Sequence, residues 1–174
     1  MNNTILLHSG NYFDFANLKE SRLSIEDIAH GLSNTCRFSG HCNRFYSVAE
    51  HCFFMSYYVP LEYAECALLH DASESVLTDI PKPLKNMLPD YVKCEMELEA
   101  AIAEQYDIPF PYPPEIKTAD RRMLITERNQ LFPEYIRKDN VWDNIEPFDL
   151  KIYCYNPETI KNLFLDRYYQ LKEM

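Results

Sequence analysis

Apolar residues recur at intervals of three or four positions along most of this chain, which is the spacing of one face of a helix. In the stretch SIEDIAHGLSN, Ile25, Ile28 and Leu32 share that spacing, and Ser24 before them is a suitable N-cap residue. The alternating aromatic residues of NYFDFANL instead favour a short extended segment near the start. Similar helical patterns predict further helices over about 47–59, 61–73, 89–106, 115–132 and 157–171.

Local signals mark the ends of several of these helices. The stretch SVAE is a capping box, in which Ser47 and Glu50 can each satisfy a backbone N–H at the start of a helix. Asn156 followed by Pro157 is the usual opening of a helix, and it predicts where the last one begins. The stretch DIPKP is expected to end the helix over 61–73 and to continue as a loop.

Composition supports one helical domain. The chain has three glycines, all before residue 41, and eleven prolines, which favours helices over a sheet with many tight turns. Its 174 residues, 47% of them hydrophobic, are enough for a substantial core. We therefore predict an all-α helical bundle with a short N-terminal β-hairpin, as a single domain over 1–174. Residues 131–174 carry no motif and are expected to form a C-terminal extension with its helix.

Charge and cysteine content narrow the range of partners. The formal net charge is −10, which would repel a nucleic-acid backbone, so no extended nucleic acid is expected as a partner. No stretch approaches the roughly 20 apolar residues of a membrane helix, and the N-terminus lacks a basic leader, so we expect a cytoplasmic protein without a membrane partner. The six cysteines form no C-x-x-C pair and are interpreted as reduced packing residues.

The candidate chemistry lies in the stretch HDASESVLTDIPKPLK, residues 70–85, which follows the apolar run ALL. It places Asp71 and two further carboxylates at the end of a segment that should be buried, where a charge requires a partner. His51 lies on the apolar face of the preceding helix, and Asp120 lies on the inner side of a later one. Together with His70, these residues would supply two imidazoles and two carboxylates to a six-coordinate divalent ion. The alternative is that His51 and His70 are core histidines with hydrogen-bond partners.

These residues resemble the H…HD…D signature of the HD-domain phosphohydrolases. The resemblance extends to the blocks CRFSGH, FYSVAEH, ALLHDASESVLTDIPKPLK and KTAD, which follow one another in the order found in that family. They are similar to the small bacterial and phage enzymes that act on 5′-deoxynucleotides, both 5′-deoxynucleotidases and dATP triphosphohydrolases. The motif-bearing core covers about 24–130.

The resemblance implies a role for each matching residue. His51, His70, Asp71 and Asp120 would bind the metal, and Glu74 would position or activate the attacking water, sometimes through a second divalent ion. The remaining roles concern the substrate: Arg37 would grip phosphate, Phe38 would pack on the sugar, and Asp79 would contact the 3′-hydroxyl. Phe38 stands where the family often has tryptophan, so discrimination against ribose stays open.

The residues themselves suggest how a chain of charge −10 could attract a phosphate ester. Residues 28–49 contain no Asp or Glu but include Arg37, His41 and Arg44, which makes the segment locally positive. Arg37 can hold phosphate with a bidentate fork, although it could also pair with an internal carboxylate. His41, Lys82 and Lys85 are further candidates for the substrate pocket. The alternatives are that His41 is structural and that the two lysines contact only solvent.

We therefore expect a phosphohydrolase of 5′-deoxynucleotides that depends on a divalent metal, with Co, Mn, Zn, Fe and Mg all open. Two reactions remain alternatives: release of phosphate from a dNMP and release of triphosphate from a dNTP. A preference for dATP is suggested only by the resemblance to the phage enzymes. The rival from another class is a catalytically silent nucleotide-binding module. A di-iron oxidation site is a third reading that would need more histidine ligands. The aromatic content favours a homo-oligomer, and a phage-encoded chain would act in the host cytoplasm.

Overall fold

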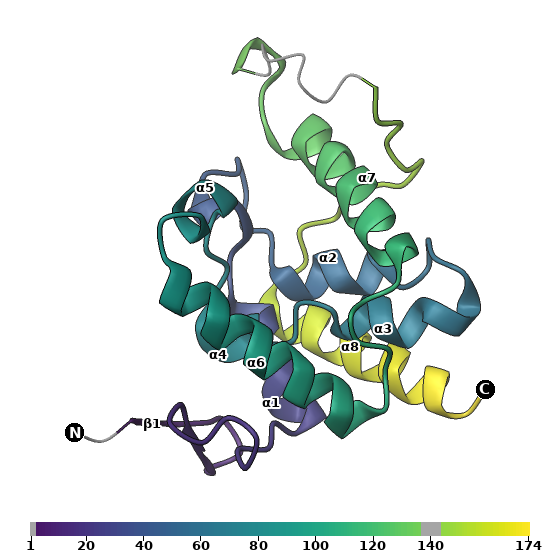
Figure 1. Cartoon of the computed structure of the whole chain (residues 1–174). Coiled ribbons are helices and arrows are strands. Elements are labelled where there is room, and N and C mark those ends of the chain that lie inside the picture. The colour runs from purple at the N-terminus through teal and green to yellow at the C-terminus, as the bar shows by residue number, and fades with distance from the viewer. Residues whose placement is uncertain (1–2, 137–143) are drawn as a thin grey trace.

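The computed structural model describes residues 3–136 and 144–174, and nearly all of its regular structure is helical (Figure 1). An antiparallel hairpin of β1 (Thr4–Leu6) and β2 (Tyr12–Asp14) precedes the helices, with Ile5 opposite Phe13. The helices are α1 (Ile25–Asn34), α2 (Val48–Met55), α3 (Ala64–Leu69), α4 (Glu74–Leu77), α5 (Lys82–Lys85), α6 (Pro89–Tyr106), α7 (Pro114–Leu131) and α8 (Pro157–Lys172), with short 3-10 turns η1 (Arg37–Gly40), η2 (Leu61–Tyr63) and η3 (Glu134–Ile136). The predicted all-α class with an N-terminal hairpin is confirmed. Residues 1–2 of the expected domain, and 137–143 of the expected extension, lie outside the described residues.

The predicted helix starts follow from their caps. The side chains of Ser24, Ser47 and Asn156 each accept a hydrogen bond from a backbone N–H three residues later. Glu50 does not complete the predicted capping box. Its carboxylate instead accepts hydrogen bonds from the backbone N–H groups of residues 153–155, at 2.8 to 3.1 Å, and so fixes the segment before α8 against α2.

The helix predicted over 61–73 is divided in the structure. After Leu69 the chain continues through tight turns, in which the N–H of Ala72 bonds to the carbonyl of Leu69 at 3.0 Å and that of Glu74 to Asp71 at 2.9 Å. These bonds span three residues rather than four, so the side chains of this segment are rotated relative to a continuous α-helix. The prediction of a loop at the prolines is also wrong in part, because Lys82–Lys85 forms the short helix α5. Pro83 lies in the first turn of this helix, where proline is tolerated.

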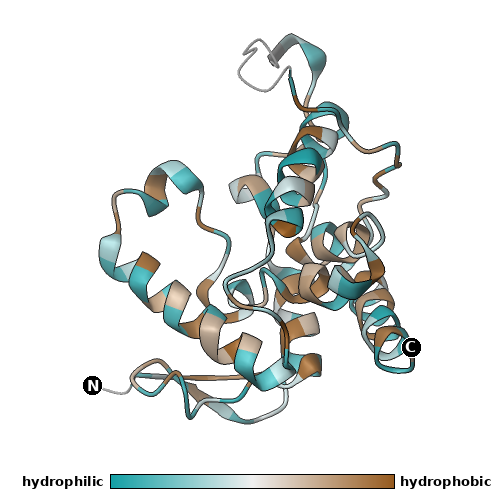
Figure 2. Cartoon of the chain, turned by 45° about the vertical axis from the view of Figure 1, so that its right-hand side comes forward, coloured by the Kyte–Doolittle hydropathy of each residue, from teal (hydrophilic) through white to brown (hydrophobic). Residues whose placement is uncertain are grey.

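Helix α8 packs on α1, α2 and α3 and runs to the right-hand side of the bundle in Figure 1. The helices alternate hydrophobic and hydrophilic segments, as amphipathic helices around a shared core should (Figure 2). The core includes Ile28, Leu32, Leu68 and Phe164, which are fully buried. Helix α7 rises above the rest of the bundle in Figure 1, and its lower part contacts α2. Within the described residues, no helix is both long and apolar enough to span a bilayer.

Candidate metal centre

Two imidazole rings face each other inside the bundle. His51 belongs to α2 and is fully buried, and His70 is the C-cap residue of α3 and is almost fully buried. Their Nε2 atoms are 3.4 Å apart. Asp120 of α7 places Oδ1 at 3.4 Å from His51 Nε2, and Asp71 places Oδ1 at 3.2 Å from His70 Nε2. The structure therefore brings together all four side chains that the sequence proposed as ligands.

The hydrogen bonds on the far side of each ring show which nitrogen is free. His51 Nδ1 lies 2.6 Å from a carboxylate oxygen of Glu127, and His70 Nδ1 lies 2.8 Å from the carbonyl of Ala67. Because a carboxylate and a carbonyl only accept hydrogen bonds, both Nδ1 atoms carry the proton. Nε2 of each ring is then the nitrogen available to a ligand, and the two Nε2 atoms point at each other, a contact that a proton or a metal cation between them would stabilise. The donor set and its orientation fit a metal ion.

The electrostatics of this cluster also require positive charge. Burial opposes protonation of His70, but the neighbouring Asp71 carboxylate raises the pKa of His70 well above its ordinary value. Burial likewise opposes ionisation of Asp71, yet His70 lowers the pKa of that carboxyl. Both shifts indicate that positive charge is stabilised at this cluster. A divalent cation would satisfy the same group of nitrogen and oxygen atoms.

Within residues 3–136 and 144–174, two overlapping sets of ligand atoms lie close enough together to hold a metal ion. They are His51, His70 and Asp120, and Cys52, His70 and Asp71, with the ligand atoms of each set within 4.8 Å of one another. In the second set, the buried Cys52 thiol lies 3.9 Å from His70 Nδ1, the nitrogen that already donates to Ala67. Burial raises the pKa of Cys52 to about 11, so the thiol stays protonated. We therefore favour the set that uses both Nε2 atoms. All six cysteines are free.

Glu127 is the residue at this site that the sequence did not reveal. It is fully buried on α7, two turns after Asp120, and Tyr46 donates a hydrogen bond to its Oε1 at 2.9 Å. Burial opposes its ionisation, but Arg37 and His51 lower the pKa of Glu127 below its ordinary value. The only sequence signal was its position on the inner side of the helix that carries Asp120. Glu127 orients His51 through Nδ1.

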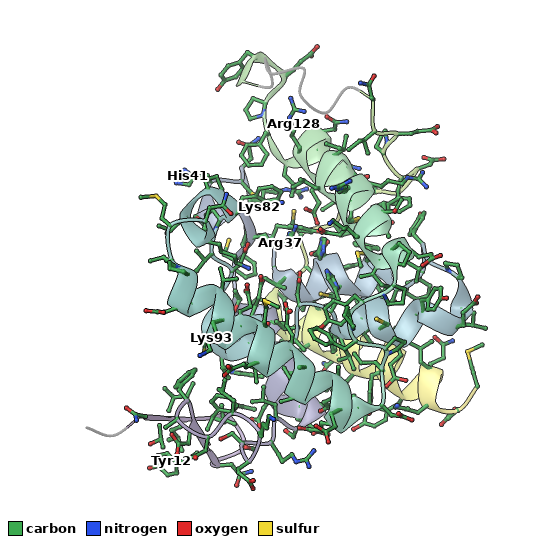
Figure 3. All side chains as sticks on the ribbon, viewed as in Figure 1. Tyr12, Arg37, His41, Lys82, Lys93 and Arg128 are labelled. Carbon is green, nitrogen blue, oxygen red and sulfur yellow. The ribbon has the colours of Figure 1, made fainter. Side chains whose placement is uncertain are left out.

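Arg37 lies in the interior between α2 and α7 (Figure 3). Its Nη2 is 3.1 Å from Glu127 Oε2, and its Nη1 is 3.6 Å from Asp71 Oδ2. The alternative considered for the sequence, pairing with an internal carboxylate, is thus present, and phosphate contact remains a prediction. Phe38 lies beside Arg37 with its ring 5.5 Å from the guanidinium, and its positive φ of 54° is rare for a residue with a side chain. Phe38 also packs edge-to-face on Phe132.

The carboxylates of the HDASESVLTD block lie near the four ligands. Glu74 is buried at the start of α4, and its Oε2 has no hydrogen-bond partner. Burial and then Asp71 raise the pKa of Glu74 well above its ordinary value. Asp79 is partly buried, and burial raises its pKa although Arg37 opposes the effect.

The three remaining candidates are placed differently. His41 and Lys82 are exposed, and the contacts of the described residues do not connect their side chains with the four ligands. Figure 3 shows His41 at the outer side of the molecule near α5. Lys85 is partly buried and is already bound to Glu74 and Glu95. A contact of these residues with substrate stays a prediction.

The fold and this centre define the chain as a helical protein with a buried cluster of histidines and carboxylates that could hold a metal ion. No family model matches the sequence. The uncharacterized protein YfdR of Escherichia coli strain K12 is 46% identical over 123 residues, which cover 71% of this chain and 69% of that protein. The uncharacterized protein RCAP_rcc00048 of Rhodobacter capsulatus is 34% identical over 121 residues, covering 64% of this chain and 62% of that protein. The chain belongs to the same family as YfdR.

Proposed function

We propose that the protein is a divalent-metal-dependent phosphohydrolase of the HD-domain type that acts on 5′-deoxynucleotides. The observation that carries the proposal is the convergence of His51, His70, Asp71 and Asp120 from three parts of the fold, with the two Nε2 atoms 3.4 Å apart and each within 3.4 Å of a carboxylate oxygen. The order of the sequence blocks around these residues supports the same class. The names of the two relatives describe no activity.

The side chains around the centre suit hydrolysis of a phosphate ester. A divalent ion held by the four ligands would polarise a phosphate oxygen and lower the pKa of a bound water. Glu74 in its ionised form would accept the proton of that water, because burial and Asp71 raise its pKa and so make the carboxylate a stronger base than an exposed one. Arg37 offsets part of the negative charge through Asp71. Asp79 would accept a hydrogen bond from the 3′-hydroxyl of the sugar.

The donor set leaves several metals open. Imidazole nitrogens with carboxylate oxygens suit Mn²⁺, Co²⁺, Fe²⁺ and Zn²⁺, and Mg²⁺ would rely more on the carboxylates and on water. The test is a panel of dNMPs, dNTPs and ribonucleotides with Mn²⁺, Co²⁺ and Mg²⁺, in which phosphate and triphosphate are resolved as products. Hydrolysis of deoxynucleotides is the expected result. If metal binds but no member of the panel is hydrolysed, the silent nucleotide-binding module replaces the proposal.

The ligand assignment has its own test. Asp71→Ala should lower metal affinity and turnover by more than about 100-fold, because it removes a ligand together with a carboxylate that pairs with Arg37. Glu97→Ala is a matched control, since Glu97 is an exposed acid of α6 whose ion pair, among the described residues, is with the exposed Lys93. Metal content is measured by elemental analysis and turnover by product release. An Asp71→Ala protein with full turnover and no metal would contradict the assignment.

A further inference from the structure

A second group of charged side chains lies next to the proposed centre, at the junction of α4, α5 and α6. The ammonium of Lys85 is 2.6 Å from Glu95 Oε1 and 3.5 Å from Glu74 Oε1, so one lysine joins two buried carboxylates. Lys85 ends α5, Glu95 lies on α6, and Glu74 begins α4. The side chain of Lys85 is 21% exposed, so water screens these contacts only in part.

Tyr91 completes the connection between these helices. Its hydroxyl donates a hydrogen bond to the carbonyl of Thr78 at 3.1 Å, just after α4, and lies 3.4 Å from Glu95 Oε1. The ammonium of Lys85 is 6.0 Å from the centroid of the Tyr91 ring, within the range of a cation–π contact. Helix α6 therefore fixes Lys85 through Glu95 and holds the end of α4 through Tyr91.

The two oxygens of Glu74 have different surroundings. Lys85 contacts Oε1, whereas Oε2 is buried and has no hydrogen-bond partner among the described residues. Four charged groups act on the Glu74 carboxylate. Asp71 and Asp79 disfavour its negative charge, whereas Lys85 and Arg37 stabilise it. Of the two cations, Arg37 is bound to Glu127, so Lys85 is the one in contact with Glu74.

We propose that Lys85 is a positioning residue for Glu74, held in place by Glu95. Its ammonium binds Oε1, fixes the rotamer of the carboxylate and leaves Oε2 for the reacting water. Glu95 acts only through Lys85, and Lys85 itself does not touch the substrate. The inference rests on the proposed function of Glu74, and it assigns to Lys85 a protein contact in place of the phosphate contact expected from the sequence.

Kinetics with metal analysis test the proposal on a substrate that the wild type hydrolyses. Lys85→Met should lower kcat by about 10- to 100-fold, as for other residues that orient a catalytic group, while KM changes less than about threefold. Metal content should stay at the wild-type level, because the four ligands are untouched. Lys85→Arg should recover part of kcat. Lys93→Met, which removes an exposed lysine of α6, is the matched control and should behave as the wild type.

A double-variant cycle separates this role from general stabilisation. If Glu95 acts through Lys85, then Glu95→Gln lowers kcat in the wild type but has little further effect in Lys85→Met. If the two substitutions instead lower kcat independently, so that their effects multiply in the double variant, then Glu95 does not act through Lys85. A Lys85→Met protein with kcat within twofold of the wild type would overturn the positioning role altogether, as would a loss that appears only in KM.

An experiment without substrate keeps the inference distinguishable from the proposed function. The ¹⁵N-ammonium NMR signal of Lys85 is identified by its absence in Lys85→Arg. We expect Glu74→Gln to shift this signal and Glu95→Gln to accelerate its exchange with water. A signal unchanged by both substitutions would contradict the contacts on which the inference depends. An inactive wild type with both NMR effects would refute the phosphohydrolase but leave the Lys85 bridge in place.

Discussion

At the scale of single residues, the centre depends on a carboxylate that touches no proposed substrate. Glu127 is fully buried, and its oxygens contact His51 Nδ1 at 2.6 Å and Arg37 Nη2 at 3.1 Å. A carboxylate behind a metal-binding histidine fixes the tautomer and the direction of the ring. The Arg37 guanidinium and the hydrogen bond from His51 compensate for the burial of Glu127. One side chain thereby determines which nitrogen of His51 is free and where Arg37 lies.

We expect Glu127→Gln to weaken metal binding by about 10- to 100-fold, because a neutral amide orients and polarises His51 less well. The measurement is a calorimetric titration with Mn²⁺ or Co²⁺, after circular dichroism has shown that the variant is folded. Tyr46→Phe is the control, since it removes one hydrogen bond to Glu127 but keeps the carboxylate. Equal metal affinity in Glu127→Gln and the wild type would show that Glu127 has no part in positioning His51.

The sequence located the four candidate ligands better than the side chains that hold them in place. Helical spacing places His51 on an inner face, and burial of charge after the run ALL marks Asp71, so local pattern was sufficient for both. The contact between His51 and Glu127 joins residues 76 positions apart, and no periodicity reports such a pairing. Glu50 shows the same limit. Its spacing from Ser47 suggested a local cap, but its carboxylate binds backbone more than 100 residues away.

At the scale of elements, long helices were predicted closely and short ones were missed. Helices α6 (Pro89–Tyr106) and α7 (Pro114–Leu131) extend over several turns, so their apolar spacing is clear. Helices α4 and α5 have four residues each, about one turn, which is too short to show a period. The position of α4 depends instead on packing. A Cβ atom added to Gly31 of α1 would lie 2.6 Å from the carbonyl oxygen of Ser75, next to Glu74.

We therefore expect Gly31→Ala to destabilise the protein by about 1–3 kcal/mol, because α1 and α4 would have to move apart. In an open helix the same change stabilises by about 1 kcal/mol, so the sign of the effect is diagnostic. Urea unfolding measures it, and Asn34→Ala at an exposed position of α1 should stay within about 0.5 kcal/mol of the wild type. Turnover should fall as well, since α4 begins at Glu74. A more stable Gly31→Ala would rule out the close approach.

At the scale of the whole molecule, the centre joins separate parts of the bundle. His51 comes from α2, His70 and Asp71 from the turn after α3, and Asp120 from α7, which rises above the other helices in Figure 1. The chain also carries a net charge of −10, so buried carboxylates add to a repulsion already present. A cation bound at these side chains would reduce the local repulsion and tie α7 to α2.

Metal binding should therefore be visible in the stability of the whole chain. A ligand that binds only the folded state at 100 times its Kd stabilises by about 2.7 kcal/mol, which for a chain of this size raises Tm by roughly 5–10 °C. Calorimetric melting with and without Mn²⁺ or Co²⁺ measures the shift, and a chelator should reverse it. Glu97→Ala should keep the shift and Asp71→Ala should lose it, although the two substitutions change the net charge equally. The same shift in both variants would mean that the ions bind the acidic surface, and α7 would then be held by protein contacts alone.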